Sequence, residues 1–181
     1  MSKKNEIFIS VDIETSGPIP GEYSLLSIGA CNVDDFRQEF FCELKPISNN
    51  ADPKALEISR LSLEELARSG KSPVEAMSDF LAWLRSIAGV NDALVFVGFN
   101  APFDWSFINY YFHKFIGSNP FGFAGLDIKA YYMGVTGCCW ADTRSSAMDA
   151  ALNPTKKSDH HALHDAQYQA ELFRLIRRKA M

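Results

Sequence analysis

Two carboxylates stand two residues apart in the sequence, at Asp12 and Glu14. They fall in or just after the run 7–13, whose β-branched and aromatic residues predict a buried strand. Because residues i and i+2 of a strand point to the same face, the two acids should project together. Adjacent carboxylates repel each other unless they are protonated or neutralised by cations. The pair indicates a cation site, and a solvated edge strand carrying two acids explains it equally well.

A third acid, Asp104, follows the apolar run 93–98, which also predicts a strand. A polar turn that contains Asn100 connects this strand to a predicted helix over 104–116, which is rich in aromatic residues. Taken alone, Asp104 is better explained as an ordinary helix N-cap, a position that Asp favours.

Polar residues gather near the predicted start of the last helix, over 160–179: His160, His161, His164 and Asp165. We expect Asp165 to lie one turn into this helix and His160 to stand at its entry. A capped polar helix start is the alternative. Three histidines within five residues favour a functional site.

The intervening chain must bring these three segments together. Strands are predicted over 7–13, 25–33 and 36–44, and the short connection between the last two indicates an antiparallel meander. Capping boxes that begin at Ser62 and Ser72 predict two helices. Further helices are expected over 126–133 and near 142–151. This order predicts an α/β fold with a mixed sheet flanked by helices, in a single domain over 1–181.

Together the segments resemble the three exonuclease motifs of the DEDDh superfamily, which includes the proofreading subunit of bacterial DNA polymerase III, RNase T and oligoribonuclease. The matching segments are Asp12-x-Glu14-Thr, Asn100-Ala-x-Phe-Asp104 and His160-x-Ala-Leu-x-Asp165-Ala. The sister class has a tyrosine four residues before the last aspartate, where this chain has His161. The resemblance implies an RNase H-like fold, with a three-stranded meander and added parallel strands flanked by α-helices.

The resemblance also implies a 3′–5′ exonuclease that hydrolyses single-stranded DNA or RNA ends and releases 5′-mononucleotides. Two Mg²⁺ or Mn²⁺ ions would be held by the acids of the motifs: Asp12, Glu14, Asp104 and Asp165. Both ions prefer hard oxygen ligands, and a pair of them can serve the attacking and leaving oxygens of an in-line displacement. His160 would be the general base, because an imidazole exchanges protons near neutral pH.

Weaker substrate-binding expectations follow from the same resemblance, for the turn after the first motif and for the second motif: Thr15, Ser16, Gly17, Asn100 and Phe103. Core packing explains Phe103 equally well. Relatives often have His where this chain has Phe99 and Glu where it has Ser27, which bears on substrate choice rather than on catalysis.

Basic residues near the last helix receive no firm substrate role. Lys156 and Lys157 precede His160 and could touch phosphate, and a solvated loop explains them better. The basic residues of the last turns suit the negative end of the helix dipole. These are Arg174, Arg177, Arg178 and Lys179.

The net charge of −4 argues against a protein that coats long duplex DNA, since Lys and Arg supply most non-specific affinity for phosphate. Four site acids account for that charge, so a small footprint at the end of a nucleic-acid strand is expected.

No C-x-x-C pair is present, and the neighbouring Cys138 and Cys139 are expected to be buried thiols. No signal peptide and no run approaching ~20 apolar residues is found, so a cytoplasmic protein without a membrane span is expected.

Two other functions compete with the exonuclease. A catalytically dead relative would bind nucleic-acid ends or a partner, but all five catalytic positions are filled. A His-Asp phosphohydrolase using His161, His164 and Asp165 would be all-helical, which the strand-rich first third opposes. The choice between DNA and RNA stays open, and so does a homodimer, the state of RNase T and oligoribonuclease.

Overall fold

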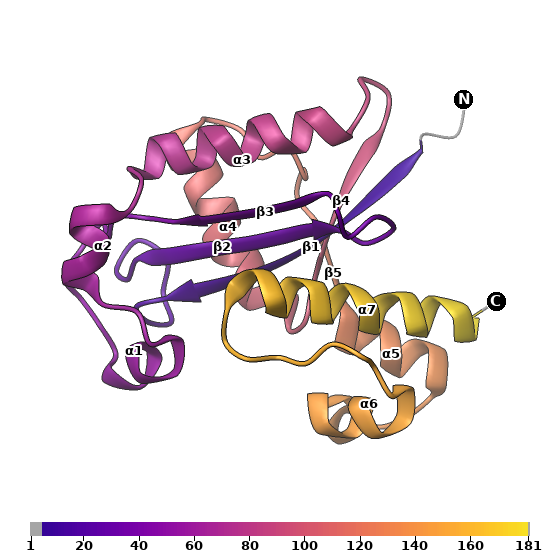
Figure 1. Cartoon of the computed structure of the whole chain (residues 1–181). Helices are drawn as coiled ribbons and strands as arrows, with labels where there is room; N and C mark the ends of the chain where they lie inside the picture. The colour runs from indigo at the N-terminus through magenta and orange to yellow at the C-terminus, as the bar shows by residue number, and fades with distance from the viewer. Residues whose placement is uncertain (1–4, 181) are drawn as a thin grey trace.

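The computed structural model describes residues 5–180, so positions 1–4 and 181 of the expected domain lie outside the described residues. Within that range, five strands form one sheet in the order β3-β2-β1-β4-β5 (Figure 1). An antiparallel meander is formed by β1 (Glu6–Thr15), β2 (Leu25–Asn32) and β3 (Glu39–Glu43). Strands β4 (Ala93–Gly98) and β5 (Gly125–Asp127) add in parallel beside β1. The expected mixed sheet is confirmed.

Helices cover both faces of this sheet (Figure 1). The helices in chain order are α1 (Pro53–Ser59), α2 (Leu63–Ser69), α3 (Pro73–Ile87), α4 (Ala101–Phe115), α5 (Ile128–Thr136), α6 (Ser145–Leu152) and α7 (Ala162–Ala180), with a 3₁₀ turn over Trp140–Thr143. One apolar core joins the sheet to α3 and α4, and a second joins it to α5, α6 and α7. No helix of residues 5–180 combines the length and apolar character needed to cross a membrane.

Helix starts follow the predicted capping residues. The hydroxyl of Ser62 accepts from the backbone N–H of Glu65 at the start of α2. At the start of α3, Ser72 and Glu75 cap each other's backbone N–H groups, and Pro73 stands at the first helical position, where its missing N–H costs nothing. Both predicted starts are confirmed.

The side chains of β1 alternate between the two cores. Val11 and Ile13 are buried in the core formed with α3 and α4. Asp12 and Glu14 therefore project to the opposite face, toward α7. This confirms the strand on which the first motif was placed, although β1 is longer at both ends than the predicted run.

Gly29 allows α7 to lie directly on the sheet. It pairs with Asp12 across β1 and β2, so it faces the same helix. A Cβ atom at this position would lie 2.1 Å from backbone atoms of Ala162 and Leu163, far inside van der Waals contact. A residue without a side chain at Gly29 thus brings the first turn of α7 next to Asp12.

Some local structure differs from the predictions. The predicted helix over 126–133 is present from Ile128, where α5 begins, but Leu126 and Asp127 belong to β5 (Gly125–Asp127). Helix α1 (Pro53–Ser59) was not predicted, because its short sequence has no clear apolar stripe. Cys138 is half-buried and Cys139 is exposed, since both follow the end of α5 at the surface.

Gly29→Ala should lower the free energy of unfolding by about 1–3 kcal/mol, because its methyl group would force α7 away from β2. Urea unfolding followed by circular dichroism measures the change. Gly134→Ala in α5 is the matched control: its Cβ meets nothing within 4 Å, so it should stabilise the protein by about 0.5–1 kcal/mol. A Gly29→Ala protein as stable as the wild type would show that α7 does not lie this close to the sheet.

Candidate active site

The site forms where β1 extends past its parallel neighbour. Strand β4 pairs with β1 only as far as Ser10 and Val97, whereas β2 pairs with β1 to its end. The last residues of β1 therefore have an open side at the carboxyl end of two parallel strands. Ligands of α/β sheets bind in this kind of crevice, next to a change in strand order.

Asp104 occupies the open side of β1. Its Oδ1 accepts a hydrogen bond of 3.2 Å from the backbone N–H of Ile13. Ile13 pairs with β2 but lies beyond the last residue of β1 that pairs with β4. Helix α4 starts after Asn100, whose φ of 62° is left-handed, a conformation that Asn tolerates better than most residues. Asp104 is therefore a buried residue of the first helical turn, rather than the N-cap.

Asp127 fixes the start of α4 from the other side. One carboxylate oxygen accepts from the backbone N–H of Ala101 at 2.7 Å, and the other accepts from that of Ala130 at 2.7 Å. It thus caps α4 and α5 together. Sequence reasoning missed this role because residue 127 was placed inside a helix, although Asp directly before an apolar helical run is an N-cap signal.

Asp165 lies one turn into α7, as expected, and holds the preceding loop. Its oxygens accept hydrogen bonds of 2.9 Å from the Ser158 hydroxyl and of 2.9 Å from the backbone N–H of Asp159. His160 follows with a φ of 63°, a left-handed conformation that costs a non-glycine residue roughly 1–2 kcal/mol. Strained backbone of this kind concentrates at functional sites.

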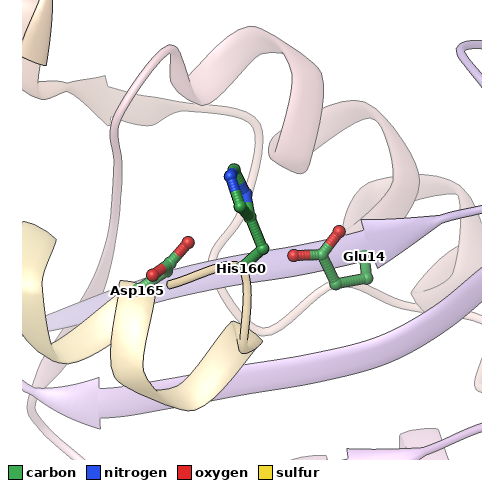
Figure 2. Close-up of side chains that lie close together, drawn as sticks. All are labelled: Glu14, His160 and Asp165. Carbon is green, nitrogen blue, oxygen red and sulfur yellow. The ribbon is translucent and has the colours of Figure 1, made fainter. Parts of the chain in front are cut away.

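Glu14, His160 and Asp165 come together although the chain separates the first from the others by more than 140 residues. Each offers a ligand atom, and these atoms lie within 4.8 Å of one another. Figure 2 shows the Glu14 carboxylate on β1 and the Asp165 carboxylate on α7, with the exposed His160 side chain between them. Asp12 and Asp104 lie outside this set of three. The charges of Asp104, Asp165 and Glu14 nevertheless act on Asp12.

Gln169 connects Asp12 to the turn after β4. Its side-chain oxygen accepts from the backbone N–H of Phe99 at 2.9 Å, which leaves its NH₂ group to donate to Asp12 Oδ1. The buried amide is therefore held in one orientation. Gln169 was not singled out from the sequence, and its position one turn after Asp165 was the only available signal.

The carboxyl groups of the site are electrostatically strained. Burial, followed by the charges of Asp104, Asp165 and Glu14, raises the pKa of Asp12 well above its usual value. Burial and the charge of Asp165 raise the pKa of Glu14 to about 7. Burial raises the pKa of Asp104 to about 8 despite its backbone hydrogen bonds. Each of these carboxyls is harder to ionise here than in water.

The residues expected to contact substrate differ in exposure. Thr15 and Ser16 are buried, and their hydroxyls donate to backbone oxygens of Gly17 and Asn50, so these side chains hold the turn. Asn100 is exposed beside Asp104. The half-buried Phe103 packs on Phe107 and the core, in line with the alternative given for it.

The donor set fits a hard divalent cation. Carboxylate oxygens are the ligands that Mg²⁺ and Mn²⁺ prefer, and bound cations would offset the burial and the repulsion that raise these pKa values. The exposed imidazole of His160 stands at the rim, within reach of solvent. The arrangement can hold cations, activate a water molecule and move its proton.

Comparisons with known proteins agree with this chemistry. Residues 7–177 match the family described as the 3′-5′ exoribonuclease Rv2179c-like domain. The 3′-5′ DNA exonuclease Cap18 of Escherichia coli is 56% identical over 176 residues, covering 97% of this chain and 94% of that protein. The PolC-type DNA polymerase III of Thermotoga petrophila is 26% identical over 181 residues, covering 95% of this chain but 12% of that protein.

Solved structures share the fold at low identity. The nuclease domain of 3′hExo, a DEDDh family member bound to rAMP, has a TM-score of 0.76 at 12% identity, covering 98% of this chain and 94% of that chain. E. coli Exonuclease I in complex with a dT13 oligonucleotide has a TM-score of 0.74 at 16% identity, covering 97% of this chain and 42% of that chain. The RNase H-like fold is thereby confirmed. With the family match over most of its length, the chain belongs to the 3′-5′ exoribonuclease Rv2179c-like family and is a 3′–5′ exonuclease.

Proposed function

We propose that this chain hydrolyses single-stranded DNA from its 3′ end and releases 5′-mononucleotides, with two Mg²⁺ or Mn²⁺ ions in the site. The observation that carries the proposal is the convergence of Glu14, His160 and Asp165 within 4.8 Å, beside the strained carboxyls of Asp12 and Asp104. We propose DNA rather than RNA as the substrate because the relative that is 56% identical is named a DNA exonuclease. The family description names an exoribonuclease, so RNA is the alternative substrate.

The residues divide the work by position. Asp12, Glu14, Asp104 and Asp165 would hold the ions, which supply charge stabilisation at the phosphate and lower the pKa of a bound water. His160 takes the proton from the attacking water, and its exposure lets it pass that proton to solvent. Asp165 keeps His160 in place through its two hydrogen bonds to the loop. Gln169 and the N–H of Ile13 orient Asp12 and Asp104.

Replacing the general base or the central ligand should remove most turnover. His160→Ala should lower kcat by about 10²–10⁴-fold, the usual contribution of a positioned base, and Asp12→Ala by at least as much. A time course on 5′-labelled single strands of DNA and RNA, with Mg²⁺, Mn²⁺ or EDTA, gives polarity, sugar preference and metal need together. His113→Ala, an exposed histidine of α4, is the control and should keep full activity. Wild-type rates in His160→Ala or Asp12→Ala would refute the assignment.

Without metal, the protein should become less stable as pH rises from about 5 to 8. In the fold, the pKa is raised to about 7 for Glu14 and to about 8 for Asp104, against roughly 4 in an unfolded chain. Between these values the folded state binds protons that the unfolded state has released, so rising pH favours unfolding. Thermal unfolding in EDTA at pH 5.5 and 8.0 measures the loss, and Mn²⁺ should reverse most of it at pH 8.0.

Asp104→Asn is the matched control for this pH dependence. The amide oxygen can still accept from Ile13, but it does not titrate, so the fall in the unfolding temperature should be smaller. An unfolding temperature that rises from pH 5.5 to 8.0 in EDTA would contradict the strained state of these carboxyls.

Gln169→Leu should weaken the site by removing the contacts that Gln169 makes with Asp12 and with the turn after β4. The variant keeps side-chain volume but loses the donor to Asp12 and the acceptor for Phe99, and losing such a supporting contact typically costs 10–100-fold in metal affinity or activity. The Mn²⁺ concentration for half-maximal activity should rise accordingly. Asn109→Leu, in α4, is the control, because it also loses a side-chain amide that accepts a hydrogen bond, from Asn119. An unchanged Mn²⁺ requirement in Gln169→Leu would remove its positioning role.

A further inference from the structure

One face of α7 leads away from the active site. Residues spaced three or four apart point outward there, while Asp165, Tyr168, Leu172 and Ile176 are buried against the sheet. From His164 to Arg178 this outer face runs about 21 Å, at 1.5 Å per residue. We call it the α7 strip, and its members are His164, Gln167, Glu171, Arg174 and Arg178.

Two polar hollows lie along the α7 strip. The first, next to His160, is lined by Lys156, Lys157, Asp159, His164 and Gln167. The second is lined by Asp34, Arg174, Arg177 and Arg178. The ring of Phe36 joins them, since the Lys156 amine lies 5.5 Å from its centre and the Arg174 guanidinium 5.0 Å.

Three cations of this region form no ion pair with a described residue, although the charges of Lys156 and Glu171 act on each other. Arg177 pairs with Asp34 at 3.3 Å and Lys157 with Asp149 at 3.3 Å. Across residues 5–180, no carboxylate lies within 4.0 Å of the charged nitrogens of Lys156, Arg174 or Arg178. The helix dipole accounts for Arg178 in the last turn, but its effect fades before Arg174. A surface of this kind, in a chain with net charge −4, fits an anionic ligand.

Aromatic rings stand at the active-site end of the α7 strip. The His161 ring stacks on the rings of Phe41 and His164, with ring centres 4.5 Å and 4.4 Å apart. His164 is half-exposed and anchored by Asp159, 2.9 Å from its Nδ1. Proteins that bind single strands without sequence preference combine such stacking surfaces with a cationic groove that follows the backbone.

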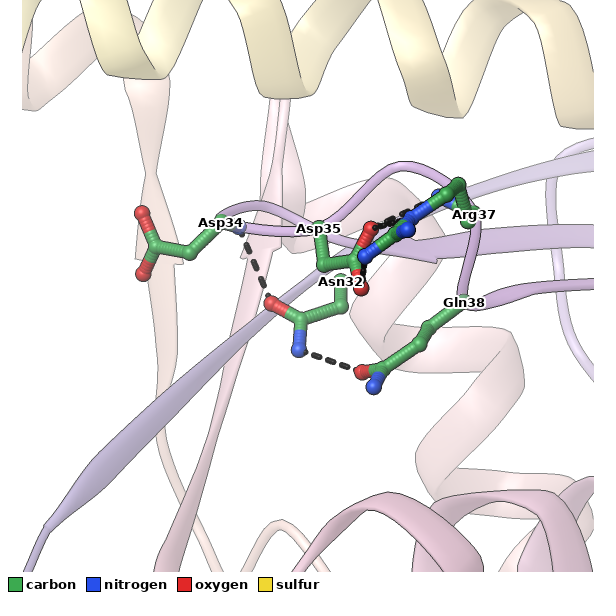
Figure 3. Close-up of polar contacts among 5 residues, drawn as sticks. All are labelled: Asn32, Asp34, Asp35, Arg37 and Gln38. Atoms are coloured by element: carbon green, nitrogen blue, oxygen red, sulfur yellow. Dashed lines mark hydrogen bonds and ion pairs between the residues drawn. The ribbon is translucent and has the colours of Figure 1, made fainter.

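Side-chain hydrogen bonds hold the two segments that flank the α7 strip, the β2–β3 hairpin and the 155–156 loop. In the β2–β3 hairpin, the Asn32 amide donates to Gln38 at 2.7 Å and its oxygen accepts from the Asp34 N–H at 2.9 Å (Figure 3). On the α7 side, the Glu171 carboxylate holds the 155–156 loop by accepting from the Thr155 hydroxyl and the Lys156 N–H. The backbone at Lys156 and the hairpin that carries Phe36 are therefore held by side-chain hydrogen bonds, and such preorganisation lowers the entropy cost of binding.

We propose that the α7 strip binds the part of a single strand that lies 5′ to the nucleotide being removed. Arg174 and Arg178 of the strip, with Lys156 beside it, contact successive phosphates. His164 stacks on a base next to the catalytic centre. The inference rests on the proposed function for its ligand. It adds that long single strands bind more tightly than short ones.

The test separates strand binding from turnover. Fluorescence anisotropy with a labelled 12-nucleotide DNA in EDTA gives Kd without hydrolysis, and cleavage of a dinucleotide in Mn²⁺ gives activity without the strip. Arg174→Gln with Arg178→Gln should weaken 12-mer binding about tenfold at low salt. The slope of log Kd against log salt should fall by about 1.4, or about 0.7 per lost cation. Dinucleotide cleavage should be unchanged.

Matched variants decide the alternatives. Arg68→Gln with Arg85→Gln removes the same charge from α2 and α3 and should leave 12-mer binding unchanged. His164→Leu should weaken binding about fivefold or more, and His164→Phe should restore it. Equal loss in both arginine pairs, or none in the α7 pair, would overturn the inference, whatever the dinucleotide rate. Equal competition by a polyglutamate peptide would also overturn it, in favour of an acidic protein partner. Absence of dinucleotide cleavage by the wild type would count against the proposed function alone.

Discussion

Mutual repulsion among carboxyl groups at the end of β1 is the constraint on which the rest of the site depends. Asp12 and Glu14 cannot avoid each other, because a strand projects every second side chain to one face. Two helices then bring Asp104 and Asp165 to the same place, and burial makes Asp12 and Asp104 still harder to ionise. A protein core tolerates such a cluster when fixed donors and bound cations offset its charge.

The acids and the base stand on different parts of the fold. Asp12 and Glu14 lie on a central strand, where Gln169 donates to Asp12, and the N–H of Ile13 donates to Asp104 on α4. His160 instead occupies an exposed, left-handed position on a loop that Asp165 ties to α7. Rigid ligands and a solvent-accessible base suit their separate tasks, since metal sites need fixed geometry and a proton must leave the site.

Local patterns predicted the parts of the fold that are locally determined. Alternation placed Asp12 and Glu14 on one face, and capping boxes placed the starts of α2 and α3. Strand β5 was missed because three residues carry no periodicity and the following helix dominates the pattern. The proposed site residues came from three motifs, each of them short and local in the sequence.

Features that depend on packing between distant segments were not predictable. The need for Gly29 follows from the register of β2 against β1 and from the height at which α7 crosses them. Gln169 acts through Phe99, 70 residues away in the chain. Lys156 and Arg174 meet only around Phe36, so their separate positions in the sequence suggested a solvated loop and a helix end.

Calorimetric titration of Mn²⁺ into the protein at pH 6.5, in two buffers of different ionisation enthalpy, tests whether cations bind to the buried carboxyl groups at the end of β1. At this pH, Glu14 and Asp104 are largely protonated in the fold, so ions that bind to them must displace protons. We expect Mn²⁺ to bind with release of one or more protons, and we expect Asp12→Ala to lose that binding. Binding without proton release, or binding that survives Asp12→Ala, would contradict this expectation.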